Sequence, residues 1–170
     1  MDQRVFVGIG SNVGDSASNC ISSIERLRED KKVKLLSVSS LYVTTPVSSI
    51  RQNDFINCAV SILWGRSPFE LLRLLNRIEH EMGRVRGVKN GPRVIDLDIL
   101  LFGDLILETP SLMVPHPELH KRKFVIIPCI EIDPFVVHPV YKRELKEFIP
   151  EIGDEQKIEK LTDKDSLNFH

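Results

Sequence analysis

The order in which two kinds of apolar periodicity follow each other constrains the fold of this chain more than any other feature. Segments at 4–10, 33–43, 54–63 and 94–102 show strand-like alternation or are rich in valine and leucine, which predicts four β-strands. Apolar residues recur at helical spacing after the first and after the third of these segments. The predicted order is therefore strand, helix, strand, strand, helix, strand.

Both predicted helices have recognisable starts. Asp15 or Ser16 caps the first helix, which continues to about residue 30. The second begins with Ser67 as N-cap and Pro68 at the first helical position, and Glu70 completes a capping box. Right-handed connections place both helices on one face of an antiparallel sheet of the four strands. We therefore expect an α+β fold of the ferredoxin-like βαββαβ type.

The remaining residues are predicted to add smaller elements to this core. Residues 103–149 contain a Pro-His-Pro turn, a helix near 121–132 that ends at Pro134, and a short hairpin. A chain of 170 residues suits one domain. A folded chain of this length buries about 70% of the surface that the unfolded chain exposes, which is enough to form a core. We expect this domain to span 1–150 and to be followed by a polar, frayed C-terminal tail at 151–170.

Composition excludes several classes of protein. With 42% hydrophobic and 28% charged residues, the chain is not disordered, collagenous or a coiled coil. The formal net charge of -1 disfavours a globally basic nucleic-acid binder and leaves a local basic patch open. The three cysteines form no CxxC pair, which excludes a zinc knuckle and suits buried thiols in a reducing compartment. We expect a cytoplasmic monomer without membrane or nucleic-acid partners.

Asp96 and Asp98 are the most specific chemical feature. On a strand, residues two apart point the same way, so both carboxylates share one face. Carboxylates roughly 7 Å apart repel each other and need cations. Mg²⁺ suits such hard ligands, because it binds through one or two carboxylates together with substrate phosphates. The alternative is a pair of surface aspartates that form ion pairs with Arg93.

A basic loop at 83–93 precedes this strand. Its cations are Arg84, Arg86, Lys89 and Arg93, and it contains no acidic residue. Arginines beside clustered carboxylates suit phosphates bridged by metal ions. We therefore predict a polyphosphate site, the alternative being a solvated turn held by ion pairs. The P-loop pattern GxxxxGK[ST] is absent from the sequence, so a P-loop enzyme is excluded.

A second basic cluster follows the fourth strand. His116 stands between two prolines that stiffen its backbone, and residues 120–123 add further basic side chains. A lone histidine is more often structural, so a contact with phosphate is the minority interpretation at this point.

Residues 89–100 closely resemble the signature of the 6-hydroxymethyl-7,8-dihydropterin pyrophosphokinases, a family of folate biosynthesis. Other segments match this family in order and spacing over about residues 4–140: Gly10–Asn12, Ser39–Tyr42, Thr44–Pro46, Phe55–Asn57, Arg77–Glu79, Gly83–Arg86 and Val114–His116. The combination is far more specific than any one segment. The chain departs from the family pattern at Asn90 and Pro117, where aromatic residues are common in the family.

The resemblance implies an ATP- and Mg²⁺-dependent enzyme that transfers diphosphate from ATP to the hydroxymethyl group of the pterin and releases AMP. It implies that Asp96 and Asp98 bind two Mg²⁺ ions and form the catalytic set with Arg84 and Arg93. The implied pterin contacts are Thr44, Thr45, Phe55, Asn57 and Phe124. The implied ATP contacts are Asn76, Glu79, Arg86, Lys89, Ile99, His116 and Arg122.

Two other functions stay open. A binding module for nucleotide or RNA is compatible with the fold, which hosts many functions. The low aromatic content of 6% and the paired aspartates disfavour RNA. A simple kinase that transfers one phosphoryl group would release ADP instead of AMP, so the nucleotide product separates it from the pyrophosphokinase.

Overall fold

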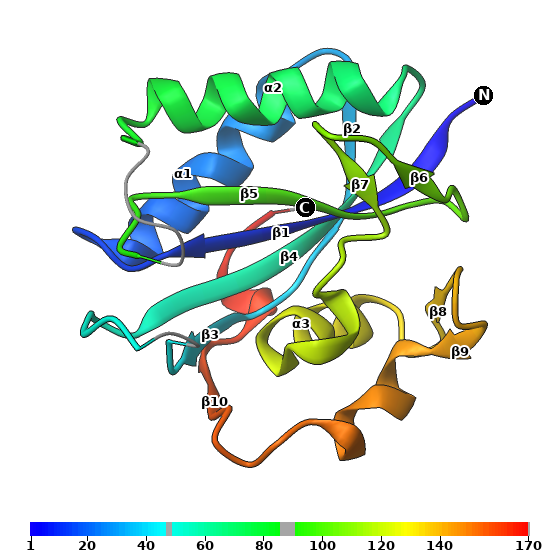
Figure 1. Ribbon diagram of the computed structural model, residues 1–170. Coiled ribbons are helices and arrows are strands. Elements are labelled where there is room, and N and C mark those ends of the chain that lie inside the picture. Colours follow the sequence, from blue (N-terminus) through cyan, green and yellow to red (C-terminus); the bar gives the residue numbers. More distant parts are fainter. Residues whose placement is uncertain (47–48, 86–90, 170) are drawn as a thin grey trace.

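The centre of the protein is one antiparallel sheet (Figure 1). The computed structural model describes residues 1–46, 49–85 and 91–169. The strands follow the order β10-β3-β4-β1-β5, and β2 also pairs with β4. Their bounds are β1 Gln3–Ser11, β2 Val33–Val38, β3 Leu41–Thr44, β4 Phe55–Trp64, β5 Asp96–Phe102 and β10 Ile158–Thr162.

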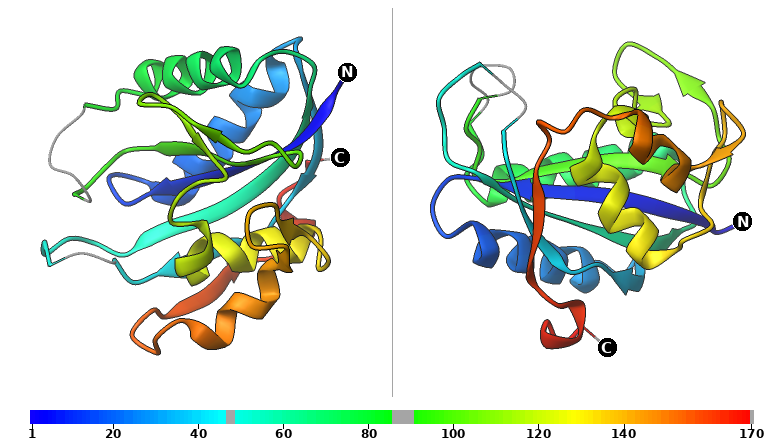
Figure 2. Two further views of the ribbon diagram at one scale, coloured as in Figure 1. Left: turned by 45° about the vertical axis from the view of Figure 1, so that its right-hand side comes forward. Right: turned by 90° about the horizontal axis from the view of Figure 1, so that it is seen from below.

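Helices cover both faces of this sheet. Helices α1 (Ser16–Glu29) and α2 (Pro68–Glu81) lie together on one face, as the right-handed connections predict, and α3 (Lys123–Ile132) lies on the other (Figures 1 and 2). The predicted caps are confirmed. The Asp15 carboxylate accepts a hydrogen bond from the backbone of Ser18 at 3.1 Å, and the Ser67 hydroxyl accepts one from Glu70 at 3.2 Å.

Strand alternation divides the core in two. Val5, Val7 and Ile9 of β1 point toward α1 and α2, where they join the larger apolar cluster. Phe6, between them in sequence, belongs to a second cluster under α3. Side chains of β1 and β4 are buried on both faces of the sheet, as expected for its central strands.

The prediction of a single strand at 33–43 is wrong. The chain forms β2 and β3 instead, with a break at Ser39 and Ser40, and both strands pair with β4. The Ser39 hydroxyl accepts a hydrogen bond from the backbone of Ala59 at 2.9 Å, inside the gap between the two ladders. The backbone N–H of Ser39 also donates to the oxygen of Ala59 at 2.9 Å, so the hydrogen bonds of Ser39 connect the break to β4.

The prediction of a frayed tail is wrong for residues 158–162. These residues form β10, which pairs with β3 and covers the edge that the expected sheet left open. The C-terminal helix begins at Lys123, later than predicted, because residues 119–121 form a separate turn of 3-10 helix.

The predicted short hairpin is confirmed. It consists of β8 (Val137–His138) and β9 (Arg143–Glu144), and a second one, β6 (Leu107–Glu108) with β7 (Met113–Val114), was not predicted. The 3-10 helices are Leu119–Lys121, Leu145–Glu151 and Lys164–Ser166. Among the described residues, every helix is too short or too polar to cross a lipid bilayer.

Candidate active site

The paired aspartates lie at the start of β5, on the face of the sheet that α3 covers. Asp96 stands opposite Gly10 of β1, and Asp98 stands opposite Gly8. The residues next to them in sequence, Leu97 and Ile99, are buried in the core on the other face. The two carboxylates therefore share one face, as their spacing predicts.

Asp96 is held between two arginines. Its Oδ1 accepts a hydrogen bond from Arg84 Nη1, and its Oδ2 accepts one from Arg93 Nη1, both at 2.8 Å. These side chains are 17–21% exposed, so they form a partly enclosed cluster at the sheet rather than a solvated surface pair. Such charge-assisted contacts fix both guanidinium groups beside the carboxylate.

Glu79 of α2 supports this cluster from behind. Its carboxylate accepts hydrogen bonds from Arg84 and from the backbone of Leu97, the latter at 2.8 Å. Burial raises the pKa of Glu79, and the nearby Asp96 carboxylate adds to this shift, while the hydrogen bond from Leu97 and the charge of Arg84 oppose it. Glu79 thus braces Arg84 and the backbone of β5.

Asp98 is short of cationic partners. Desolvation raises its pKa to about 7, and the Asp96 and Glu79 carboxylates add to the shift. Nevertheless, 44% of its side-chain surface is open, so a cation in the cleft can reach the carboxylate. In the described part of the chain, the one basic side chain within 4.0 Å of this carboxylate is His116, whose Nε2 lies 4.0 Å from Asp98 Oδ2.

His116 is held as a neutral donor. Its Nδ1 accepts a hydrogen bond from the backbone of Glu118 at 3.1 Å, so the neutral ring carries its proton on Nε2. Burial lowers its pKa, and the charge of Arg122 lowers it further. At neutral pH, His116 therefore presents an N–H group to the cleft beside Asp98.

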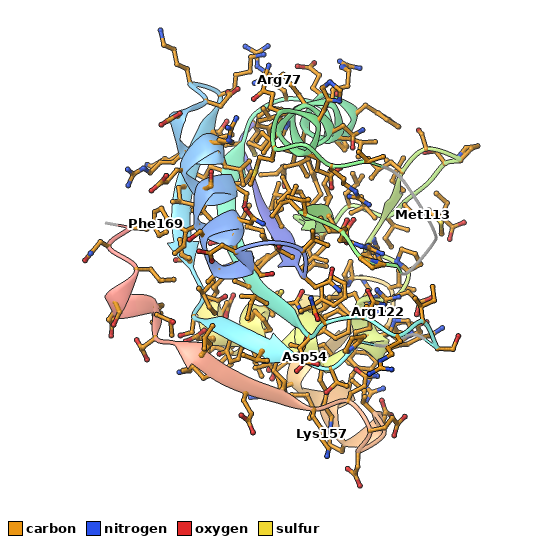
Figure 3. All side chains as sticks on the ribbon, turned by 90° about the vertical axis from the view of Figure 1, so that its left-hand side faces the viewer. Asp54, Arg77, Met113, Arg122, Lys157 and Phe169 are labelled. Atoms are coloured by element: carbon orange, nitrogen blue, oxygen red, sulfur yellow. The ribbon has the colours of Figure 1, made fainter. Side chains whose placement is uncertain are left out.

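Next to the aspartates, a cavity opens at the end of β3 and the start of β4. All five residues expected at the pterin line it: Thr44, Thr45, Phe55, Asn57 and Phe124. Neither aromatic ring belongs to the two apolar clusters, so ordinary core packing does not account for them. Figure 3 looks onto this end of the sheet and labels Arg122 and Asp54 there.

Asn57 occupies a close-fitting position in this cavity. Its Nδ2 donates to Thr44 Oγ1 at 2.6 Å, which fixes the orientation of the carboxamide. A Cβ atom added at Gly10 would lie only 2.6 Å from Asn57 Oδ1. Glycine at position 10 therefore leaves room for this amide, consistent with the small residues that alternate along β1.

A second cavity adjoins the first, and a third adjoins the second. The second is lined by Asp96, Asp98 and His116, and it shares Arg122 and Phe124 with the first cavity. The third lies beyond Asp98 and His116, along Ile99. Phosphate groups in the second cavity would therefore lie beside a ring in the first.

Some predicted ATP contacts are not brought into these cavities. Asn76 is exposed on α2 and lines none of the three. Glu79 lies behind them, against Arg84. Arg86 and Lys89 lie outside the described residues, as does Asn90.

Sequence reasoning missed the connecting role of Asn12. Its Nδ2 donates to Gln52 Oε1 at 2.9 Å and to the backbone oxygen of Asn53 at 3.0 Å, and its Oδ1 accepts from the backbone of Arg93 at 2.9 Å. The side chain thus links the loop before β4 to the segment that carries Arg93. Its position directly after the first strand was the available signal.

The donor set fits magnesium bound together with phosphates. Within the described residues, no group of three or more histidine, cysteine, aspartate or glutamate side chains could hold a metal ion without other ligands. Asp96 and Asp98 would supply two ligands from one face of the sheet, and the Asp98 carboxylate is open to the cleft and poorly neutralised. Water and phosphate oxygens would fill the remaining coordination positions of the ion.

What the fold and the site define together is a class of protein: an α+β enzyme that acts on phosphate groups beside a flat organic ring. A family model described as 7,8-dihydro-6-hydroxymethylpterin-pyrophosphokinase matches residues 6–134. The chain belongs to this family and is a pyrophosphokinase of folate biosynthesis.

Named relatives agree with this assignment. A 2-amino-4-hydroxy-6-hydroxymethyldihydropteridine pyrophosphokinase of Aquifex aeolicus is 42% identical over 147 residues, which cover 86% of this chain and 91% of the relative. The Bacillus subtilis protein of the same name is 43% identical over 132 residues, or 78% of this chain and 79% of the relative.

Other relatives are much longer than this chain. A folic acid synthesis protein of Dictyostelium discoideum is 39% identical, and the chain spans 20% of its length. A crystal structure of HPPK-DHPS from Plasmodium falciparum has a TM-score of 0.68 at 15% identity, covering 89% of this chain and 43% of that one. At this identity, the similarity to the Plasmodium falciparum structure concerns the fold alone.

Proposed function

We propose that this chain binds ATP with two Mg²⁺ ions and transfers its β,γ-diphosphate to the hydroxymethyl oxygen of 6-hydroxymethyl-7,8-dihydropterin, releasing AMP. The observation that carries the proposal is the position of Asp96. It lines both the aromatic cavity and the cavity that holds Asp98, and it is hydrogen-bonded to Arg84 and Arg93. A reacting phosphate and a pterin hydroxyl can therefore meet at this carboxylate.

The first cavity suits a flat ring with polar edges. Phe55 and Phe124 supply aromatic faces, and the Asn57 carboxamide supplies a donor and an acceptor for the ring edge. An arginine accompanies each aromatic ring, with Arg93 Cζ 5.8 Å from the Phe55 centroid and Arg122 Cζ 5.6 Å from that of Phe124. Two of the cations proposed to bind phosphate, Arg93 and Arg122, thus also lie against the aromatic walls of the ring-binding cavity.

Catalysis in this proposal rests on positioning and on neutralisation of charge. Bound at Asp96 and Asp98, the Mg²⁺ ions would supply charge stabilisation to the phosphate oxygens. Arg84, Arg93 and the His116 Nε2–H group would hold the same phosphates. In this proposal Asp96 would also accept the proton of the pterin hydroxyl.

The proposal predicts a specific nucleotide product. Purified protein mixed with ATP, Mg²⁺ and 6-hydroxymethyl-7,8-dihydropterin should produce AMP and a pterin diphosphate in equal amounts, as separated by chromatography. Formation of ADP would instead indicate a kinase that transfers one phosphoryl group. Folded protein that binds nucleotide and consumes none would support the binding-module alternative.

The raised pKa of Asp98 predicts an unusual stability profile. Because the folded state holds this proton more tightly than the unfolded chain, ionisation between about pH 4 and pH 7 destabilises the metal-free fold. Asp98→Asn removes the free-energy cost of ionising this buried carboxyl group. The Tm of the metal-free variant should therefore exceed that of the parent by a few degrees at pH 8 and match it near pH 4. Calorimetry checks this, with Asp104→Asn, an exposed residue after β5, as the control.

We further propose that the enzyme is a cytoplasmic monomer with one catalytic domain, formed by residues 1–150 together with the C-terminal segment whose strand β10 pairs with β3 in the same sheet. The three cysteines are free and buried, which suits a reducing compartment. Light scattering combined with size-exclusion chromatography tests the oligomeric state.

A further inference from the structure

The start of α3 is held by a residue from the far end of the chain. Gln156 Oε1 accepts a hydrogen bond from the backbone N–H of Lys123 at 3.0 Å, and its Nε2 donates to the backbone oxygen of Lys121 at 2.9 Å. One carboxamide therefore binds the backbone on both sides of Arg122. The intervening Arg122 and nearby Phe124 both line the first and second cavities.

These hydrogen bonds compensate for a missing cap. Arg122 is the N-cap residue of α3, and its side chain makes no capping hydrogen bond. The first N–H groups of a helix have no partner within the helix, so they need an acceptor from elsewhere. Gln156 supplies that acceptor to Lys123, 33 residues away in sequence.

The residue after Gln156 holds another part of the lining of the first cavity. The backbone oxygen of Lys157 accepts a hydrogen bond from the N–H of Thr45 at 3.2 Å, and Ile158 pairs with Thr44 in the sheet. Figure 3 labels Lys157 at the same end of the molecule as Arg122. Consecutive residues of one segment thus bind two separate parts of the lining of the cavity in which the ring is proposed to lie.

We infer that Gln156 is a positioning residue: it fixes Arg122 and Phe124 at a set distance from Thr44 and Thr45 and thereby sets the shape of the substrate cavity. This inference rests on the proposed function. The residue lies beyond the stretch 6–134 that the family model matches. The same segment continues into β10, whose pairing with β3 gives Gln156 a rigid support.

The test compares variants that keep the shape of the segment. Gln156→Met removes both hydrogen bonds at similar volume, and Gln156→Glu keeps an acceptor for Lys123 while losing the donor to Lys121. We expect Gln156→Met to raise KM for the pterin and for ATP about tenfold, with kcat changed much less, because substrate placement weakens. Gln156→Glu should lie between it and the parent, and Glu159→Gln, on the exposed side of β10, should behave as the parent.

Hydrogen exchange supplies a readout that does not depend on activity. Amides of residues 121–126 should exchange faster in Gln156→Met than in Glu159→Gln, at equal global stability. Unchanged exchange would overturn the inference, whether or not AMP is formed, and unchanged KM values in an enzyme that forms AMP would overturn it as well. Absence of AMP from the parent protein would overturn the proposed function alone, because the exchange comparison still decides whether Gln156 holds the segment.

Discussion

Asp96→Asn should lower kcat about a thousandfold, the loss typical of removing a charge aimed at the reacting groups. Asparagine keeps the shape of the side chain but cannot neutralise Arg84 and Arg93, each of which donates to this carboxylate at 2.8 Å. It is also a weaker ligand for Mg²⁺ and cannot act as the proton acceptor. Steady-state assays of AMP release measure the effect.

The matched control for this variant is Asp104→Asn, because Asp104 is exposed in the turn after the same strand. It should leave kcat unchanged, and circular dichroism should show both variants folded. An Asp96→Asn enzyme that keeps kcat within tenfold of the parent would contradict the assignment of this carboxylate to the reacting centre.

Gly10→Ala should raise KM for the pterin about a hundredfold, since displacements near 1 Å in a binding site cost that much. The new Cβ would lie 2.6 Å from Asn57 Oδ1, closer than two unbonded atoms allow. Asn57 would have to leave the position in which it donates to Thr44 Oγ1. Titration of the pterin at saturating ATP measures the change.

A neighbouring glycine on the same strand supplies the control. A Cβ at Gly8 would lie 3.2 Å from the flexible side-chain end of Leu100, which can move by the few tenths of an ångström required. Gly8→Ala should therefore affect KM for the pterin far less than Gly10→Ala. Equal increases in KM for the pterin from the two substitutions would show that displacement of the Asn57 carboxamide is not the cause.

Part of the arrangement of the candidate site could be predicted from local patterns. Spacing of two on a strand placed Asp96 and Asp98 on one face, and the structure agrees. The family resemblance assembled residues from four separate segments around one cavity, including Phe55 and Phe124. It placed Asn76 among the ATP contacts, whereas in the structure this residue is exposed away from the three cavities.

Contacts between distant segments could not be predicted in the same way. The hydrogen bonds of Asn12 to the loop before β4, and those of Gln156 to the start of α3, join residues 33 or more positions apart. Neither residue has a periodic partner or a charge that would mark its role. Both residues form hydrogen bonds with the backbone of other segments, and such contacts cannot be predicted from a local sequence pattern.

The sequence by itself determined the order of elements, the two helix caps and the shared face of the aspartates, because these follow from periodicity, local hydrogen bonding and the alternation of a strand. Only the tertiary structure decided that Ser39 and Ser40 interrupt a strand, that Glu79 braces Arg84, and that β10 closes the sheet. These features depend on which backbone groups and charges lie opposite one another once the chain has folded, and hydrogen bonds between distant segments form only then.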